Sequence, residues 1–100
     1  MSKNDKLAAY IGFSIKSGNV IYGYEGILTT KKRVRLVICD PTLSENSRKK
    51  LDSYLASHSL EAYELEDLPS YFGGKQVKCI GLSEEHLASA AESELKKDRR

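Results

Sequence analysis

Cys39 and Asp40 are adjacent, and a thiol beside a carboxylate could place a nucleophile next to an acid. A thiol needs a neighbouring base to become a strong nucleophile, and the sequence places no histidine to activate this one. Cys39 also ends the apolar run LVIC, as a core cysteine of a central strand would. We therefore predict a buried core cysteine, and an enzyme that acts on a small molecule near this pair is the least favoured function.

The other groups that could hold a metal ion or a nucleotide form no complete motif. His58 and His86 are the two histidines, and they are not spaced with the cysteines as metal ligands are. Gly73-Gly74-Lys75 is similar to part of a phosphate loop, but that loop continues with Ser or Thr and a helix, whereas Gln76 and a strand-like run follow here. The sequence predicts a protein that is not an enzyme, with no metal and no cofactor.

The stretch SGNVIYGYEG, from Ser17 to Gly26, places glycines and tyrosines around a short apolar run. Glycine serves where a turn needs a positive φ, or where another molecule must approach the main chain closely. We expect a helix stop at Gly18 and a tight strand-to-helix turn at Gly23. Whether Gly23 also admits a ligand, and whether Tyr22 and Tyr24 are half-buried or form a contact surface, stays open at this point.

Hydrophobic spacing predicts alternating helices and strands. A helix that begins with Asp5 as its cap carries one apolar stripe of Leu7, Ala8, Ile11 and Ile15. Strands are expected at 20–22, 34–39, 62–65 and 77–82, with helices at 24–30 and 42–57, a helical turn at 67–72 and a last helix after residue 83. We expect Thr42 with Glu45 to form a capping box for the third helix, and Ser83 to cap the last.

This order of elements implies an α/β fold with a mixed, four-stranded sheet and helices on both faces. One hundred residues allow one domain, with an ordered core at about 6–95 and a basic tail at 96–100 that we expect to be frayed. Ligands of such sheets meet the loops at strand ends. Three of these loops are unusual: Gly23-Tyr24-Glu25, Asp40-Pro41-Thr42 and Phe72-Gly73-Gly74-Lys75.

Composition and charge narrow the class of partner. Hydrophobic residues make up 40% of the chain and no run reaches the ~20 apolar residues of a membrane span. We expect no membrane partner and, because no signal peptide is evident, a cytoplasmic protein with reduced thiols. Residues 29–50 hold seven bases against two acids, a net of +5, so the rest of the chain carries −3 of the total +2. One basic face favours a polyanion partner, although a solvated surface explains the charges equally well.

Four segments, in this order and spacing, resemble the kink-turn RNA-binding family of ribosomal proteins (the "L-seven-Ae" and "L-thirty-e" group), and most of all its small bacterial members. They are FSIKSGNVIYGYE, VRLVICDPTLSENSRKKL, LPSYFGGKQVKCIGL and SEEHLASAAESEL. The resemblance spans about residues 6–95. It implies a three-layer α/β/α sandwich, and a monomeric protein that binds ribosomal or other structured RNA, with the ribosome or a partner protein as a further contact.

The resemblance also implies where RNA would bind. Gly23 would let the chain approach a kinked RNA, and Glu25 would accept hydrogen bonds from guanine edges of sheared G·A pairs. Asp40 to Ser44 would border a flipped-out nucleotide, and Phe72 to Gln76 would cover it from the other side. The full set of expected RNA-binding residues is Gly23, Tyr24, Glu25, Lys31, Lys32, Arg33, Asp40, Phe72, Gly73, Gly74, Lys75 and Gln76.

One part of the family signature differs in this chain. The family has Gly-x-Asn-Glu-x-x-Lys, whereas this chain reads Gly23-Tyr24-Glu25-Gly26-Ile27-Leu28-Thr29. Lys31, Lys32 and Arg33 would have to replace the missing lysine. The alternative function is therefore a protein-interaction module on the same fold that has lost kink-turn recognition, with Tyr22, Tyr24, Tyr71 and Phe72 as its aromatic patch.

Overall fold

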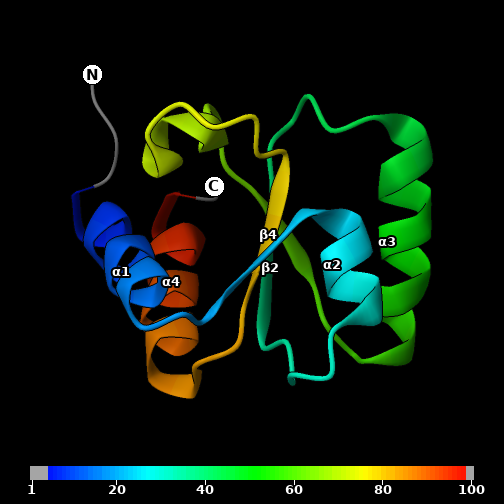
Figure 1. The fold of residues 1–100 in the computed structure, drawn as a ribbon, viewed down its shortest axis with the longest axis horizontal. Coiled ribbons are helices and arrows are strands. Elements are labelled where there is room, and N and C mark those ends of the chain that lie inside the picture. The colour runs from blue at the N-terminus through cyan, green and yellow to red at the C-terminus, as the bar shows by residue number, and fades with distance from the viewer. Residues whose placement is uncertain (1–4, 99–100) are drawn as a thin grey trace.

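The computed structural model describes residues 5–98, in which helices and strands alternate along the chain (Figure 1). The elements are α1 (Asp5–Lys16), β1 (Val20–Tyr22), α2 (Gly23–Thr29), β2 (Leu36–Cys39), α3 (Glu45–Ser57), β3 (Ala62–Glu64), the 3₁₀ helix η1 (Leu68–Phe72), β4 (Cys79–Leu82) and α4 (Glu85–Asp98). This is the predicted order of elements.

The four strands form one mixed sheet in the order β1-β4-β2-β3. Strand β3 runs parallel to β2, whereas β4 runs antiparallel to both of its neighbours, β1 and β2. Helices α1 and α4 lie together on one face of the sheet, and α2 and α3 lie on the other (Figure 1). The predicted three-layer α/β/α sandwich is therefore confirmed.

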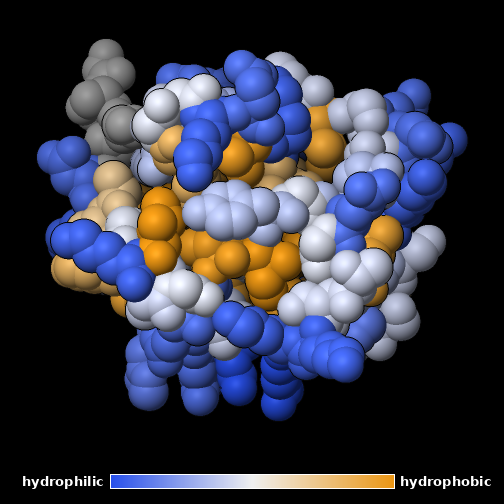
Figure 2. All heavy atoms as spheres, viewed as in Figure 1, coloured by the Kyte–Doolittle hydropathy of each residue, from blue (hydrophilic) through white to orange (hydrophobic). Residues whose placement is uncertain are grey.

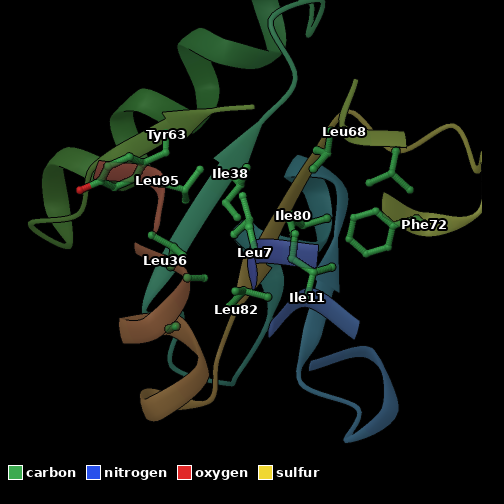
Figure 3. Close-up of a cluster of buried hydrophobic side chains, with 13 residues drawn as sticks. Leu7, Ile11, Leu36, Ile38, Tyr63, Leu68, Phe72, Ile80, Leu82 and Leu95 are labelled. Atoms are coloured by element: carbon green, nitrogen blue, oxygen red, sulfur yellow. The ribbon is translucent and has the colours of Figure 1, made fainter. Parts of the chain in front are cut away.

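The core between the sheet and the α1/α4 layer follows from the two-residue period of the central strands. Leu36 and Ile38 of β2 point to the same face as Ile80 and Leu82 of β4. Figure 3 shows Leu7 of α1 directed into this group, with Tyr63 and Phe72 at opposite ends of it. The alternate strand residues, Val37, Cys39 and Cys79, pack against Ile27, Leu51 and Leu55 of the α2/α3 layer. Both central strands are thus buried on both faces, as predicted for β2.

Gly81 of β4 allows α2 to pack closely on the sheet. A Cβ atom at this position would lie 3.1 Å from Cγ1 of Val34 and 3.4 Å from Cγ1 of Ile27, and both of those side chains are buried. We expect Gly81→Ala to lower the free energy of unfolding by about 1–2 kcal/mol, because the buried side chains of Val34 and Ile27 must shift to admit the added methyl group.

Gly12 in α1 is the matched control, because a Cβ there would meet no atom within 4 Å. Gly12→Ala should raise the free energy of unfolding by about 0.5–1 kcal/mol, since alanine is the better helix former. Urea denaturation of the two variants measures both effects. A stabilised Gly81→Ala variant would contradict the close packing of α2 on β4.

The predicted caps of α3 and α4 are wrong by one or two residues. Ser44, not Thr42, caps α3, and its hydroxyl accepts a hydrogen bond from the Ser47 amide. The Glu84 carboxylate accepts from the Leu87 amide at 2.7 Å at the start of α4, whereas Ser83 donates to the Asn19 carbonyl. In each case the predicted residue makes a different hydrogen bond outside the helix.

Four further predictions need correction. Ser14 takes the buried position on α1 that was predicted for Ile15, which is 38% exposed, because Leu7, Ile11 and Ser14 lie nearer to one helical face. Strand β2 begins at Leu36, two residues later than predicted. The Arg35 amide donates to the carbonyl of Leu82, which is also the register partner of Leu36, so Arg35 and Leu36 both lie opposite Leu82, as in a β-bulge. Helix α4 continues to Asp98, so fraying from residue 96 is wrong for 96–98. Asp5, predicted as the cap of the first helix, is instead a helical residue of α1. Residues 99–100 lie outside the described residues.

Candidate nucleic-acid interface

The three unusual loops meet at one edge of the sheet. Strands β1, β2 and β3 run in the same direction, so their carboxyl ends lie together where β4 begins. The loop from β2 to α3 and the segment from η1 to β4 both lie along this edge, at the top of Figure 1, and α2 starts beside them. The structure therefore brings together residues 23–25, 40–44 and 72–76.

A pocket of about 420 Å³ opens between these loops. We call it the loop pocket, and its lining residues are Gly23, Tyr24, Thr42, Leu43, Ser44, Ser47, Gln76, Lys78 and Cys79. Three of the twelve expected RNA-binding residues, Gly23, Tyr24 and Gln76, line it. Its lining combines hydroxyl groups, an amide and an ammonium group with apolar carbon, which suits a ligand that has both polar edges and flat faces.

The glycines of this edge are required by their backbone conformation. Gly23, Gly73 and Gly74 have φ values of 77°, 67° and 84°, in the left-handed region that other residues seldom adopt. A Cβ atom on any of the three would meet nothing within 4 Å. The architectural use of these glycines is thus sufficient to explain them, and the space around them leaves the main chain open to another molecule.

Asp40 links two of the loops through three hydrogen bonds. One carboxylate oxygen accepts from the amide and the hydroxyl of Thr42 at 2.9 and 2.6 Å, and the other accepts from the Leu68 amide at 2.9 Å. Burial by itself raises the pKa of this carboxyl, but the three hydrogen bonds and the charge of Lys78 outweigh it and hold the pKa below its usual value. Asp40 is 5% exposed and fully bonded, so it positions the loops and does not face a ligand.

Phe72 is also unsuited to the contact that was expected of it. Its side chain is 6% exposed and belongs to the core on the α1/α4 side of the sheet. The ring meets Tyr22 edge-on, with 5.7 Å between the ring centroids. The aromatic group that this edge does expose is Tyr22, at 43%.

Lysines lie over both tyrosines of the edge. The Lys75 ammonium is 5.9 Å from the centroid of the Tyr22 ring, and the Lys50 ammonium is 5.7 Å from that of Tyr24. The Lys78 ammonium donates to the Thr42 hydroxyl at 2.7 Å. Among these bases the sequence prediction included only Lys75. The one signal for Lys78 was a polar residue within the apolar run VKCIGL, and no sequence signal related Lys50 to Tyr24.

Glu25 is the acid of this edge that remains available. It lies in the first turn of α2 and its side chain is exposed. Within the described residues its carboxylate forms no hydrogen bond or ion pair, and its main-chain carbonyl accepts a hydrogen bond from the Thr29 hydroxyl. Glu25 therefore keeps both carboxylate oxygens for a donor on another molecule.

Lys31, Lys32 and Arg33 are not part of this edge. They lie between α2 and β2 at the opposite edge of the sheet, at the bottom of Figure 1. The Lys32 ammonium donates to the carbonyl of Gly18, which precedes β1, at 3.0 Å. The structure thus separates the basic stretch from the glycine loops, and these bases cannot take the place of the lysine missing from the signature.

Cys39 and Cys79 are register partners on β2 and β4, and both are buried and unbridged. A hydrogen bond with Cys79 and burial raise the pKa of Cys39 above the ordinary range of a thiol. We expect both thiols to resist a thiol-reactive dye at pH 8 in the native protein, because both side chains are buried, and to react rapidly in denaturing urea, where solvent reaches them and their thiolates can form. Rapid labelling of the native protein would contradict their burial.

Figure 2 shows hydrophobic side chains exposed in the middle of the face that β1 crosses, with hydrophilic side chains along its upper and lower edges. Across residues 5–98, no group of three or more His, Cys, Asp and Glu side chains is arranged to hold a metal ion. No helix in this part of the chain is both long and apolar enough to cross a membrane.

The protein is therefore an α/β/α sandwich in which loops at the strand ends form a pocket. No protein-family description and no curated protein matches the sequence. A solved structure of a protein with unknown function from Bacillus halodurans C is similar, with a TM-score of 0.83 and 16% sequence identity over 93% of this chain and 99% of that chain. At this identity the likeness supports the fold alone.

Proposed function

We propose that this protein binds structured RNA, ribosomal or other, through the edge that carries the loop pocket, and that it has no enzymatic activity. The supporting observation is the convergence of three loops, expected from the sequence to contact RNA, around one pocket with Lys50, Lys75 and Lys78 beside it. We further propose a cytoplasmic location, which the two unbridged thiols favour.

Each group at this edge has a role that suits RNA. Tyr22 offers an exposed ring on which an unstacked base can stack, and Lys75 beside it offers charge for a phosphate. Glu25 can accept from the N1–H and N2–H₂ groups of a guanine edge. The main chain at Gly73 and Gly74 leaves room for a backbone to pass. Shape, stacking and one base-edge acceptor would together supply the recognition.

The protein-interaction alternative has less support. Its aromatic patch required four exposed rings, but Phe72 is buried, and Tyr71 and Tyr24 pack against the two core clusters. Tyr22 alone is widely exposed, at 43%. One ring is a small anchor for a protein interface, which usually has a cluster of them.

A titration with a generic kink-turn RNA tests the proposal, with a second RNA whose G·A pairs are replaced by Watson–Crick pairs as the control. We expect tighter binding of the kink-turn RNA and an affinity that falls with salt at a slope near the number of phosphates neutralised, about 3. Equal, salt-sensitive binding of both RNAs would mean a different RNA target. No binding of either RNA at low salt would reject RNA binding at this edge.

A further inference from the structure

A second pocket, of about 670 Å³, opens at the opposite edge of the sheet from the loop pocket. It lies between the α2–β2 segment and the end of α3. We call it the basic pocket, and its lining residues are Leu28, Thr30, Lys31, Lys32, Arg33, Val34, Arg35, Tyr54, His58 and Leu60. The RNA interface proposed above uses none of these residues.

The lining carries charge of one sign. Four bases and a histidine contribute to it, and no Asp or Glu does. Within residues 5–98 none of the four basic side chains forms an ion pair, whereas Arg48, His86 and Lys97 do. Clustered bases around a concave surface concentrate the positive potential there, so an anion is the complementary ligand.

The remaining wall of the basic pocket is apolar and partly aromatic. Val34 is buried, Tyr54 and Leu60 are half-buried, and Leu28 is 38% exposed. The Tyr54 ring stacks on His58 with 4.0 Å between centroids and 23° between the planes. The His58 ring is held further by its Nδ1, 2.9 Å from the Tyr54 carbonyl. A flat, partly fixed surface thus lies beside the bases.

We propose that the basic pocket binds a nucleotide, with the phosphate on Lys31, Arg33 and Arg35 and the base against the wall of Tyr54, His58 and Leu60. The arginines can donate two hydrogen bonds each to a phosphate, and every base has a face that can lie on an apolar or aromatic surface. Inorganic phosphate alone would contact the basic side chains but leave the apolar wall of the pocket unoccupied. The nucleotide is either free or part of an RNA strand.

This proposal does not depend on RNA binding at the loop pocket, because the two pockets lie at opposite edges. Amide chemical shifts in ¹H–¹⁵N spectra report the two edges separately, through residues 31–35 and 58–60 for the basic pocket and 23–25 and 73–76 for the loop edge. The probes are AMP, inorganic phosphate and a uridine hexanucleotide, each titrated to millimolar concentration.

The test variant is Lys31→Gln/Arg33→Gln, in which both substituted side chains are exposed. The control variant is Lys6→Gln/Lys96→Gln, which also removes two positive charges, but from the α1/α4 layer. We expect AMP to shift the amides of the basic pocket and to bind more tightly than inorganic phosphate. Its affinity should fall at least tenfold in the test variant and less than twofold in the control, and kink-turn RNA binding should change equally in the two variants.

The comparison of probes separates the two sources of the nucleotide. A hexanucleotide that binds through the same amides more than tenfold tighter than AMP indicates an RNA strand, whereas similar affinities indicate a free nucleotide. Three results would overturn the proposal. They are an absence of shifts at residues 31–35 and 58–60, equal affinities for AMP and phosphate, and equal weakening in the test and control variants.

Discussion

Asp40→Asn is expected to lower the free energy of unfolding by about 2–3 kcal/mol, more than any exposed substitution in this chain. The carboxylate accepts three hydrogen bonds, two from Thr42 and one from the Leu68 amide. An asparagine retains one acceptor oxygen and turns an NH₂ group toward a donor. Either the buried Leu68 amide or the half-buried Thr42 pair would then lose its acceptor.

Asp67→Asn provides the matched control for this change. Asp67 is exposed and adopts φ 58°, a left-handed conformation that Asn tolerates as well as Asp does. We expect its free energy of unfolding to stay within about 0.5 kcal/mol of wild type. Urea denaturation at pH 7 measures both variants, and equal stabilities would mean that the Asp40 hydrogen bonds contribute nothing net.

The stabilisation by Asp40 should also depend on pH with a defined sign. The folded pKa of this carboxyl is lowered, so its contribution is fully present above the unfolded pKa of about 3.9 and is lost as the pH falls through the folded pKa. The difference in stability between wild type and Asp40→Asn should therefore be constant from about pH 7 to pH 5 and shrink below about pH 4. A difference that grows in acid would contradict the lowered pKa.

Asp40 also connects stability to the candidate interface. Its hydrogen bond to Leu68 joins the β2–α3 loop to η1, and η1 leads directly into Gly73, Gly74 and Lys75. Loss of this link would let the two sides of the loop pocket move apart. We interpret the acid at the end of β2 as a residue that positions the site, although the sequence suggested that it borders the ligand.

The fold was predictable because every element had a local signal that agreed with its neighbours. The apolar run at 36–39 indicated a strand buried on both faces, and Gly18 and Gly23 indicated the ends of the first helix and strand. Helix caps were less predictable, because Thr42, Ser44, Ser83 and Glu84 are all chemically able to cap. Which one does so depends on partners distant in sequence, as the bond of Ser83 to Asn19 illustrates.

The site was predictable only as far as the chain direction determines it. Because loops at the carboxyl ends of parallel strands meet, the convergence of residues 23–25 and 40–44 could be expected. Residues 72–76 join them because β4 runs antiparallel to β1 and β2, so that its amino end lies at the same edge. The separation of Lys31, Lys32 and Arg33 from these loops could not be expected. A count of charges along the sequence does not show at which edge of the sheet the charged side chains lie. The cation–ring contacts of Lys50 and Lys75 depend on side-chain packing and had no local signal.

Glu25→Gln and Lys75→Gln should weaken RNA binding in different ways if the loop edge is the interface. The Glu25 carboxylate has no partner within residues 5–98 and would read a base edge, so its loss should cost the kink-turn RNA about 1–3 kcal/mol, or roughly 5- to 150-fold. The control RNA without sheared pairs should bind the variant as it binds wild type. The preference between the two RNAs would therefore shrink.

Lys75 would contact a phosphate, which carries no sequence information. Lys75→Gln should weaken both RNAs by a similar factor, leave the preference unchanged and lower the salt slope by about 1. Titrations of both variants against both RNAs at two salt concentrations distinguish these patterns. Because each substituted side chain is exposed, the two variants should keep wild-type stability, so a change in affinity reports contact. If Glu25→Gln preserves the preference, base reading must lie with other residues of the edge, and Tyr22 and Gln76 become the next to substitute.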